Sequence, residues 1–122
     1  MARKFELALT LPFPVSVNAY YRAILRGKFC TSILSVKGRE FKERVANMVA
    51  ESEKNPTDKR VMCQIKLYPP DRRKRDIDNY AKSLLDSLTG IAWVDDEQID
   101  CLAISREEIV KGGKCEITIR GR

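Results

Sequence analysis

The densest group of chemically capable residues lies in the middle of the chain. A run of four cations, Arg72 to Arg75, is followed at once by Asp76 and Asp78. Guanidinium groups present planar forks of donors that match phosphate, so the run predicts a phosphate clamp made by Arg72, Arg73, Lys74 and Arg75. In extended backbone, side chains two residues apart share a face, so both carboxylates can reach one cation. A solvated turn is the alternative explanation of the run.

Lys82 extends this group into the helix predicted after it. It follows Asp78 by one helical turn and falls on the same flank, next to an apolar stripe that restricts where its side chain can go. Two structural explanations compete with a catalytic one. Asp78 can cap the helix, and the pair of Asp78 and Lys82 can be a weak surface salt bridge.

A third acidic position follows in the segment Trp93-Val94-Asp95-Asp96-Glu97, just before a predicted strand. Three carboxylates from two segments would make an all-oxygen site, which favours Mg²⁺ or Mn²⁺. Divalent ions beside a basic surface can hydrolyse phosphodiesters, because one activates water and another stabilises the leaving oxygen. The chain has no histidine, which excludes Ser-His and Cys-His catalysis and histidine metal ligands but leaves metal-activated water available.

The charge distribution supports an anionic partner. The 122 residues carry a net charge of +6, yet segment 83–110 holds seven acids and one cation, so its charge is −6 and the remainder carries +12. A basic body around an acidic patch predicts a polyanion partner with a cation bound between them. Ordinary solubility charge is the alternative.

Length and composition predict a single domain spanning 1–122 that can bury one core without metal or disulfide staples. No apolar window reaches the length of a transmembrane helix, and no secretory signal is expected at the N-terminus. The cysteines lack metal-site or redox spacing. Cys63, Cys101 and Cys115 lie in apolar, strand-like runs and are interpreted as small buried hydrophobes of a protein in a reducing cytoplasm.

The hydrophobic patterning predicts an α+β fold: a small mixed sheet with two helices packed on it, in the order β-α-β-α-β-β. Residues 15–34 show no period and are expected to form a long loop, and 111–114 carries a tight hairpin signal. The expected elements are strands at 4–11, 61–68, 99–106 and from 115 onward, and helices at 35–54, capped by Ser35, and 77–90.

Almost the whole chain resembles the RusA-type Holliday junction resolvases of bacteria and their phages. The central signature, Pro70 to Asn79 followed by Lys82, is the most specific part because of its double aspartate. The other matching segments are the proline-asparagine-tyrosine stretch 12–22, the acidic stretches 86–89 and 93–98, and the closing Lys111-Gly112-Gly113.

The resemblance implies a small homodimer that binds branched DNA, the four-way junction, and cuts two opposed strands symmetrically with Mg²⁺ or Mn²⁺. It implies metal ligation by Asp76, Asp78 and Asp96, and a catalytic Lys82 that holds the scissile phosphate or the attacking water. The residues expected to contact DNA are Asn18, Tyr21, Arg22, Arg72, Arg73, Lys74, Arg75 and Asn79. The alternative is a DNA-binding module without catalysis, which explains the basic body but not the carboxylates beside it.

Overall fold

The computed structural model describes residues 5–122, so the first residue of the strand expected at 4–11 lies outside the described part. The core of the fold is a four-stranded sheet in the order β1 (Glu6–Leu11), β6 (Lys114–Gly121), β4 (Val61–Tyr68) and β5 (Ile99–Arg106). β6 is antiparallel to both β1 and β4, whereas β5 runs parallel to β4. The α+β class and mixed sheet are therefore confirmed.

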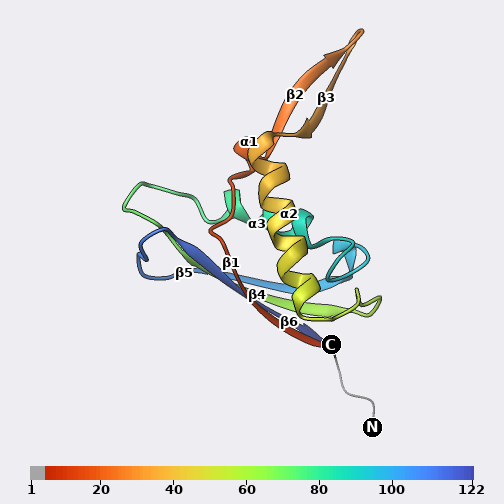
Figure 1. Cartoon of the computed structure of the whole chain (residues 1–122), viewed down its shortest axis with the longest axis vertical. Coiled ribbons are helices and arrows are strands. Elements are labelled where there is room, and N and C mark those ends of the chain that lie inside the picture. The colour runs from red at the N-terminus through yellow and green to blue at the C-terminus, as the bar shows by residue number, and fades with distance from the viewer. Residues whose placement is uncertain (1–4) are drawn as a thin grey trace.

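Alternation of apolar and polar residues decides which face of the sheet is covered. In β4 every second residue is buried, beginning with Val61, and β6 alternates in the same way. Helices α2 (Val36–Glu51) and α3 (Asp78–Leu88) pack their apolar faces on this side of the sheet (Figure 1). The apolar residues of α2 and α3 that are buried in this core are Phe41, Val45, Val49, Leu84 and Leu88.

Helix α3 lies within the crossover that joins the parallel strands β4 and β5. After the helix the chain turns through Trp93, which is fully buried and donates its indole N–H to the Thr89 hydroxyl over 3.0 Å. The short 3₁₀ helix η1 (Asp96–Gln98) then leads directly into β5. The anchored tryptophan thus fixes the acidic segment at the edge of the sheet.

The expected long loop at 15–34 is wrong. This segment forms a short helix, α1 (Val17–Tyr20), and a hairpin of β2 (Tyr21–Arg26) and β3 (Phe29–Leu34), which we call the arm. Gly27 takes a φ of 62° in its two-residue turn, a conformation that glycine adopts at no steric cost. The arm projects away from the rest of the molecule (Figure 1). Because neither of its faces packs on the core, buried and exposed residues do not alternate along its strands as they do in β4.

The hairpin expected at 111–114 is also wrong, although the turn is present. Gly112 and Gly113 have φ angles of 82° and 69°, but β5 and β6 lie on opposite sides of β4 and do not pair. The cysteine interpretation holds for Cys63 and Cys115, which are buried, and is wrong for Cys101, which is exposed, as is Cys30. Within residues 5–122, no helix is long and apolar enough to cross a membrane.

Candidate active site

One flank of α3 carries the residues that the central signature singled out. Asp78, Lys82 and Asp86 follow one another at four-residue spacing, which places them along one side of the helix. The Lys82 ammonium lies 3.5 Å from an Asp86 carboxylate oxygen, and the Lys82 side chain is 65% exposed. Among the described residues no ion pair joins Lys82 to Asp78. The salt bridge considered for that pair is replaced by one to Asp86.

Asp86 also anchors the base of the arm. The Tyr21 hydroxyl donates a hydrogen bond to the Asp86 carboxylate, and the Tyr20 hydroxyl shares one of 2.9 Å with the Ser87 hydroxyl. The Ser83 hydroxyl donates to the Val15 carbonyl over 2.5 Å. Three side chains of α3 therefore fix the segment from which the arm projects. Sequence reasoning did not select Asp86, although its position four residues after Lys82 was a usable signal.

The acidic segment before β5 is held in a defined shape. The Asp95 side chain accepts from the Glu97 backbone N–H, and Gln98 returns a bond by accepting from the Asp95 N–H over 2.7 Å. The Gln98 amide also donates to the carbonyls of Thr57 and Lys59, each over 2.8 Å. This capping box leaves Asp96 exposed at the first position of η1.

The carboxylate of Asp96 lies among like charges. Its pKa is raised above the ordinary value, first by a hydrogen bond shared with the Asp95 side chain, then by partial burial and by repulsion from Asp95 and Asp86. Lys82 opposes this shift by favouring the charged form. Asp96 and the Lys82–Asp86 pair are therefore electrostatic neighbours although they come from different segments.

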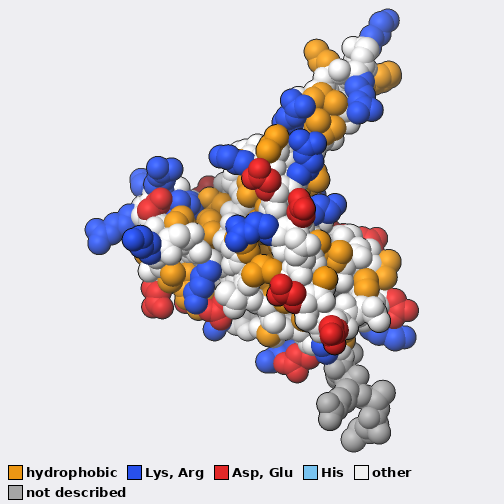
Figure 2. All heavy atoms as spheres, in the orientation of Figure 1, with side chains coloured by type: hydrophobic (Ala, Val, Ile, Leu, Met, Phe, Trp, Pro, Cys, Tyr) orange, Lys and Arg blue, Asp and Glu red, His pale blue; other side chains and the backbone are white. Residues whose placement is uncertain are grey.

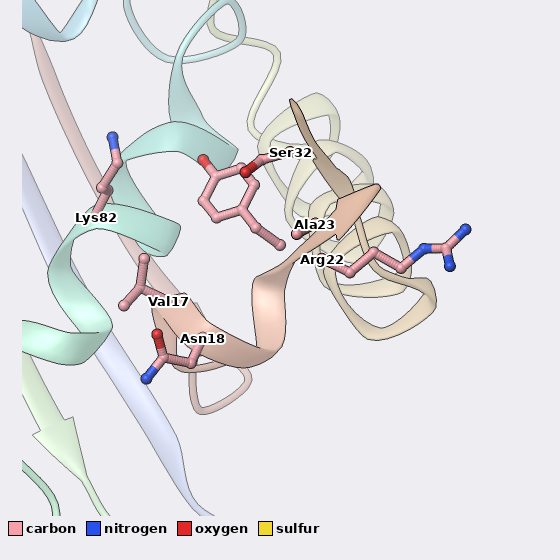
Figure 3. Close-up of a pocket in the computed structure, with 7 residues that line it drawn as sticks. Val17, Asn18, Arg22, Ala23, Ser32 and Lys82 are labelled. Carbon is pink, nitrogen blue, oxygen red and sulfur yellow. The ribbon is translucent and has the colours of Figure 1, made fainter. Parts of the chain in front are cut away.

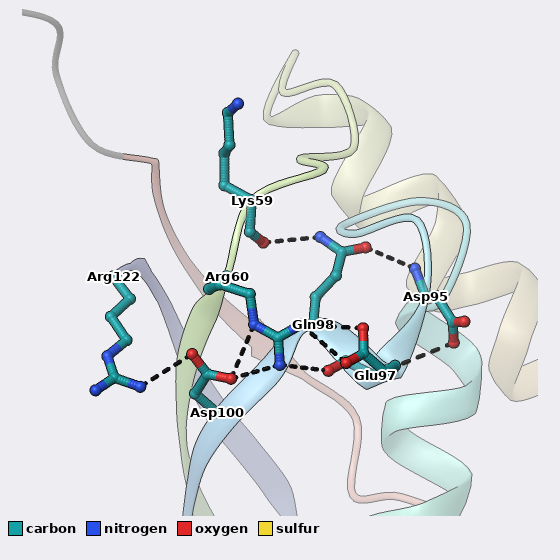
Figure 4. A network of polar contacts seen from close by, with 7 residues as sticks. All are labelled: Lys59, Arg60, Asp95, Glu97, Gln98, Asp100 and Arg122. Carbon is teal, nitrogen blue, oxygen red and sulfur yellow. Dashed lines mark hydrogen bonds and ion pairs between the residues drawn. The ribbon is translucent and has the colours of Figure 1, made fainter.

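A network of ion pairs around Arg60 holds Glu97 of η1 and Asp100 of β5 (Figure 4). Arg60 donates to both carboxylate oxygens of Glu97, at 2.9 and 3.0 Å, and to Asp100, at 2.9 Å. Arg122 adds a 3.0 Å ion pair to Asp100. Glu97 is thus engaged in holding η1 against the sheet. No sequence signal indicated Arg60, because its partners lie 37 and 40 residues away along the chain.

Asp76 and Asp78 lie at the opposite end of α3. Both are exposed, and neither takes part in an ion pair within the described part of the chain. The proposal that Asp78 caps the helix is wrong, because Ile77 occupies the N-cap and Asp78 is already in the first turn. Within the described residues, neither carboxylate is therefore neutralised by a cation. The helix dipole favours the charge of Asp78, which lies in the first turn.

In the basic run 72–75, Arg75 is held by an ion pair, and the other three residues are exposed. The Arg75 side chain is only 14% exposed, pairs with Asp71 over 2.8 Å and lies 5.5 Å from the centre of the Phe13 ring. The pKa of Asp71 is lowered, chiefly by its bond to Arg75. The exposed members are Arg72, Arg73 and Lys74, beside a surface hollow of about 310 Å³.

A larger hollow of about 520 Å³ connects α1 and the arm with α3 (Figure 3). Its lining includes Asn18, Tyr21 and Lys82, which brings two of the N-terminal residues expected to contact DNA to the predicted catalytic lysine. Arg22 also borders the hollow, but its guanidinium points away from Lys82 (Figure 3). Asn79 lies one turn before Ser83 on the same helix.

The acids therefore form two groups rather than one. Asp78 and Asp86 are separated by eight helical residues, about 12 Å along α3, and Asp96 neighbours the Asp86 end. Across residues 5–122 no group of three acidic or cysteine side chains lies close enough to hold a metal ion in this conformation.

Comparison with known proteins identifies the family. The model of the family described as "Endodeoxyribonuclease RusA" matches residues 12–120. The chain belongs to the RusA family. It is 34% identical over 118 residues to the crossover junction endodeoxyribonuclease RusA of Escherichia coli K12, covering 92% of each chain. It is 35% identical over 117 residues to the enzyme of the same name from Enterobacteria phage 82, covering 91% of each.

RusA membership confirms the resemblance noted from the motifs and makes the chain an endodeoxyribonuclease, a hydrolase, by homology. The matched range contains both acidic groups, Lys82 and the basic run.

Proposed function

We propose that this protein is a divalent-metal-dependent endonuclease that resolves four-way DNA junctions by hydrolysing two opposed strands, as a homodimer, during DNA recombination and repair in a bacterial or phage-infected cell. The observation that carries the proposal is the group at the start of α3: the exposed acids Asp76 and Asp78, which have no ion-pair partner among the described residues, and Lys82 beside a hollow of about 520 Å³, in a chain matched over residues 12–120 by the RusA model. Two relatives named as crossover junction enzymes support the substrate.

The donor chemistry fits a hard divalent cation. Asp76, Asp78 and Asp96 offer carboxylate oxygens, the ligands that Mg²⁺ and Mn²⁺ prefer, although in this conformation Asp96 lies apart from Asp76 and Asp78, at the Asp86 end of α3. A bound cation would relieve the repulsion between Asp96 and its acidic neighbours Asp95 and Asp86. When bound, the ion supplies a water of lowered pKa for attack on the phosphodiester.

The chain's own residues bind and orient the DNA. The Lys82 ammonium is exposed at the hollow and compensates the negative charge that develops on the scissile phosphate. Arg72, Arg73 and Lys74 hold phosphates farther along the strand. Asp86 positions both Lys82 and the Tyr21 end of the arm.

Two opposed cuts require two copies of this site. One chain of 122 residues presents one Lys82 and one set of acids. A four-way junction has near two-fold symmetry, which a C₂ dimer matches with one site per strand.

The test is cleavage of a labelled synthetic four-way junction with and without Mg²⁺, comparing wild type with Asp76→Asn. We expect wild type to cut two opposed strands only with metal. Asp76→Asn should bind the junction at least as tightly, because a negative charge beside phosphate is gone, but should not cut. Glu43→Gln, an exposed acid on α2, is the matched control and should cut normally. Normal cutting by Asp76→Asn would refute the metal assignment.

A further inference from the structure

The arm carries large apolar side chains that the fold does not use. Leu25 and Phe29 flank its turn, and each is 79% exposed. The cross-strand register pairs Leu25 with Cys30 and Arg26 with Phe29, so the two apolar groups stand on opposite faces of the ribbon. They are absent from the hydrophobic core and from the hydrophobics packed against it. Their exposure at the tip of a projecting ribbon makes them available to an external partner.

The charge around these groups favours an anionic partner. Residues 7–39 contain no Asp or Glu, while the arm itself carries Arg22, Arg26 and Lys28. The space-filling view shows blue and orange groups along the arm and no red (Figure 2). Two such arms laid together would oppose cations without any acid between them, which disfavours arm-to-arm pairing of two copies. A polyanion with flat apolar surfaces would match both the cations of the arm and the exposed Phe29 ring.

The base of the arm is fixed relative to the candidate active site. The Ser35 backbone N–H donates to the Tyr20 carbonyl over 2.9 Å, and the Ser35 hydroxyl donates to the Ala19 carbonyl over 2.5 Å. Tyr21 begins β2 and donates to Asp86, the partner of Lys82. With six residues in each strand, the tip reaches about 17 Å from Tyr21, or about five base-pair steps of DNA.

We propose that Phe29 and Leu25 form an apolar wedge that stacks on bases at the branch point of the junction while Lys82 engages the strand to be cut. The inference rests on the proposed junction-resolving function and adds to it the means of recognising the branch. Apolar side chains on DNA-binding elements insert between base steps, with cations beside them on the phosphates. Bases at a branch cost the least to unstack, because their stacking is already interrupted, so the wedge favours a junction over a duplex.

The experiment uses a four-way junction with 2-aminopurine at the branch, whose fluorescence rises when the base is unstacked, in buffer without divalent ions so that no strand is cut. Wild type should raise the fluorescence at the branch but not that of a probe placed in the middle of an arm of the junction. The Leu25→Ala/Phe29→Ala variant should lose this rise and bind the junction about 5- to 150-fold more weakly, the range expected for losing one stacked base. Its affinity for plain duplex should change less than about twofold.

Two variants control for structure and chemistry. Phe29→Trp keeps a stacking ring and should retain the fluorescence rise. Leu102→Ala removes an exposed apolar side chain, 42% exposed, from the edge of the main sheet and should behave as wild type. Because neither Leu25 nor Phe29 belongs to the core, the double variant should keep the wild-type melting temperature.

An unchanged fluorescence rise in the double variant, or an equal loss of junction and duplex binding, would overturn the wedge. So would sedimentation equilibrium showing that the double variant is a monomer where wild type is a dimer, since the arm would then contact a second copy. Failure of the proposed function looks different: wild type would not cut a junction in Mg²⁺, whereas binding and fluorescence require no cleavage.

Discussion

Replacing Tyr21 by Phe tests the link between the arm and α3. The variant keeps the ring, and with it the edge-on packing against Tyr20 at 4.8 Å between ring centres, but removes the hydroxyl that donates to Asp86. A hydrogen bond to a charged group contributes about 1.5–3 kcal/mol to stability when well buried. Because Asp86 remains 24% exposed, we expect a loss of about 1–2 kcal/mol, or about 4–10 °C in melting temperature for a domain of this size.

The pH dependence of this loss has a definite sign. The pKa of Tyr21 is raised from its ordinary 10.0, first by burial and then by its bond to Asp86. A raised pKa means that the contribution is fully present below pH 10 and is lost as the pH rises through the folded-state value. The difference in melting temperature between wild type and Tyr21→Phe should therefore be constant from pH 6 to pH 9 and shrink above about pH 10.

Thermal unfolding followed by circular dichroism measures this difference. The matched control is Tyr68→Phe, which removes the hydroxyl of a half-buried tyrosine on β4 whose pKa is raised chiefly by Glu116, and which should lower the melting temperature less than Tyr21→Phe does. A change below about 1 °C for Tyr21→Phe would refute the contact to Asp86, and with it the claim that α3 fixes the arm.

Three further predictions concern DNA binding, packing and thiol chemistry. Replacing Arg72 and Arg73 by Ala should lower the slope of log affinity against log salt by about 1–2, measured by fluorescence anisotropy; an unchanged slope would mean that this run does not contact phosphate. Gly38→Ala should destabilise the protein by about 1–3 kcal/mol in chemical denaturation, because a Cβ there would stand 2.3 Å from the backbone carbonyl that ends α1. A gain of about 0.5–1 kcal/mol, usual for this change in a helix, would contradict that close contact. Ellman's reagent at pH 8 should react rapidly with two thiols, Cys30 and Cys101, since burial raises the pKa values of the other two to about 11 and about 12; four fast thiols would refute their burial.

Strands buried on one face were predictable from the sequence, and the arm was not. β4 shows strict alternation because one face meets the helices, and its predicted bounds of 61–68 are those observed. The arm has solvent on both faces, so no alternation marks it, and the only local signal was Gly27 at its turn. The two glycines at 112 and 113 marked a turn correctly, but a turn signal does not say which strands pair.

The candidate site shows the same division between local and long-range information. Lys82 was selected because its helical spacing from Asp78 is readable in the sequence, and Asp76 and Asp78 because they lie two residues apart beside the basic run. Asp86 lay in a matching acidic stretch but received no site role, and its contact with Tyr21, which is 65 residues away, could not be predicted from local spacing. The placement of Asp96 near Lys82 depends on the buried Trp93 and on Gln98, whose contacts arise only in the folded chain.

The central claim is that the dimer has two active sites, each built on one subunit's Asp78 and Lys82, and that each site cuts one strand of the junction. Heterodimers of wild type and Asp78→Asn, purified through two different affinity tags and given a supercoiled cruciform plasmid in Mg²⁺, test it most directly. One active site yields one nick, so we expect open circles and almost no linear plasmid, whereas wild-type dimers should give linear product by paired cuts. Linear product from the heterodimers at the wild-type rate would contradict the claim, because one intact site would then suffice for both strands.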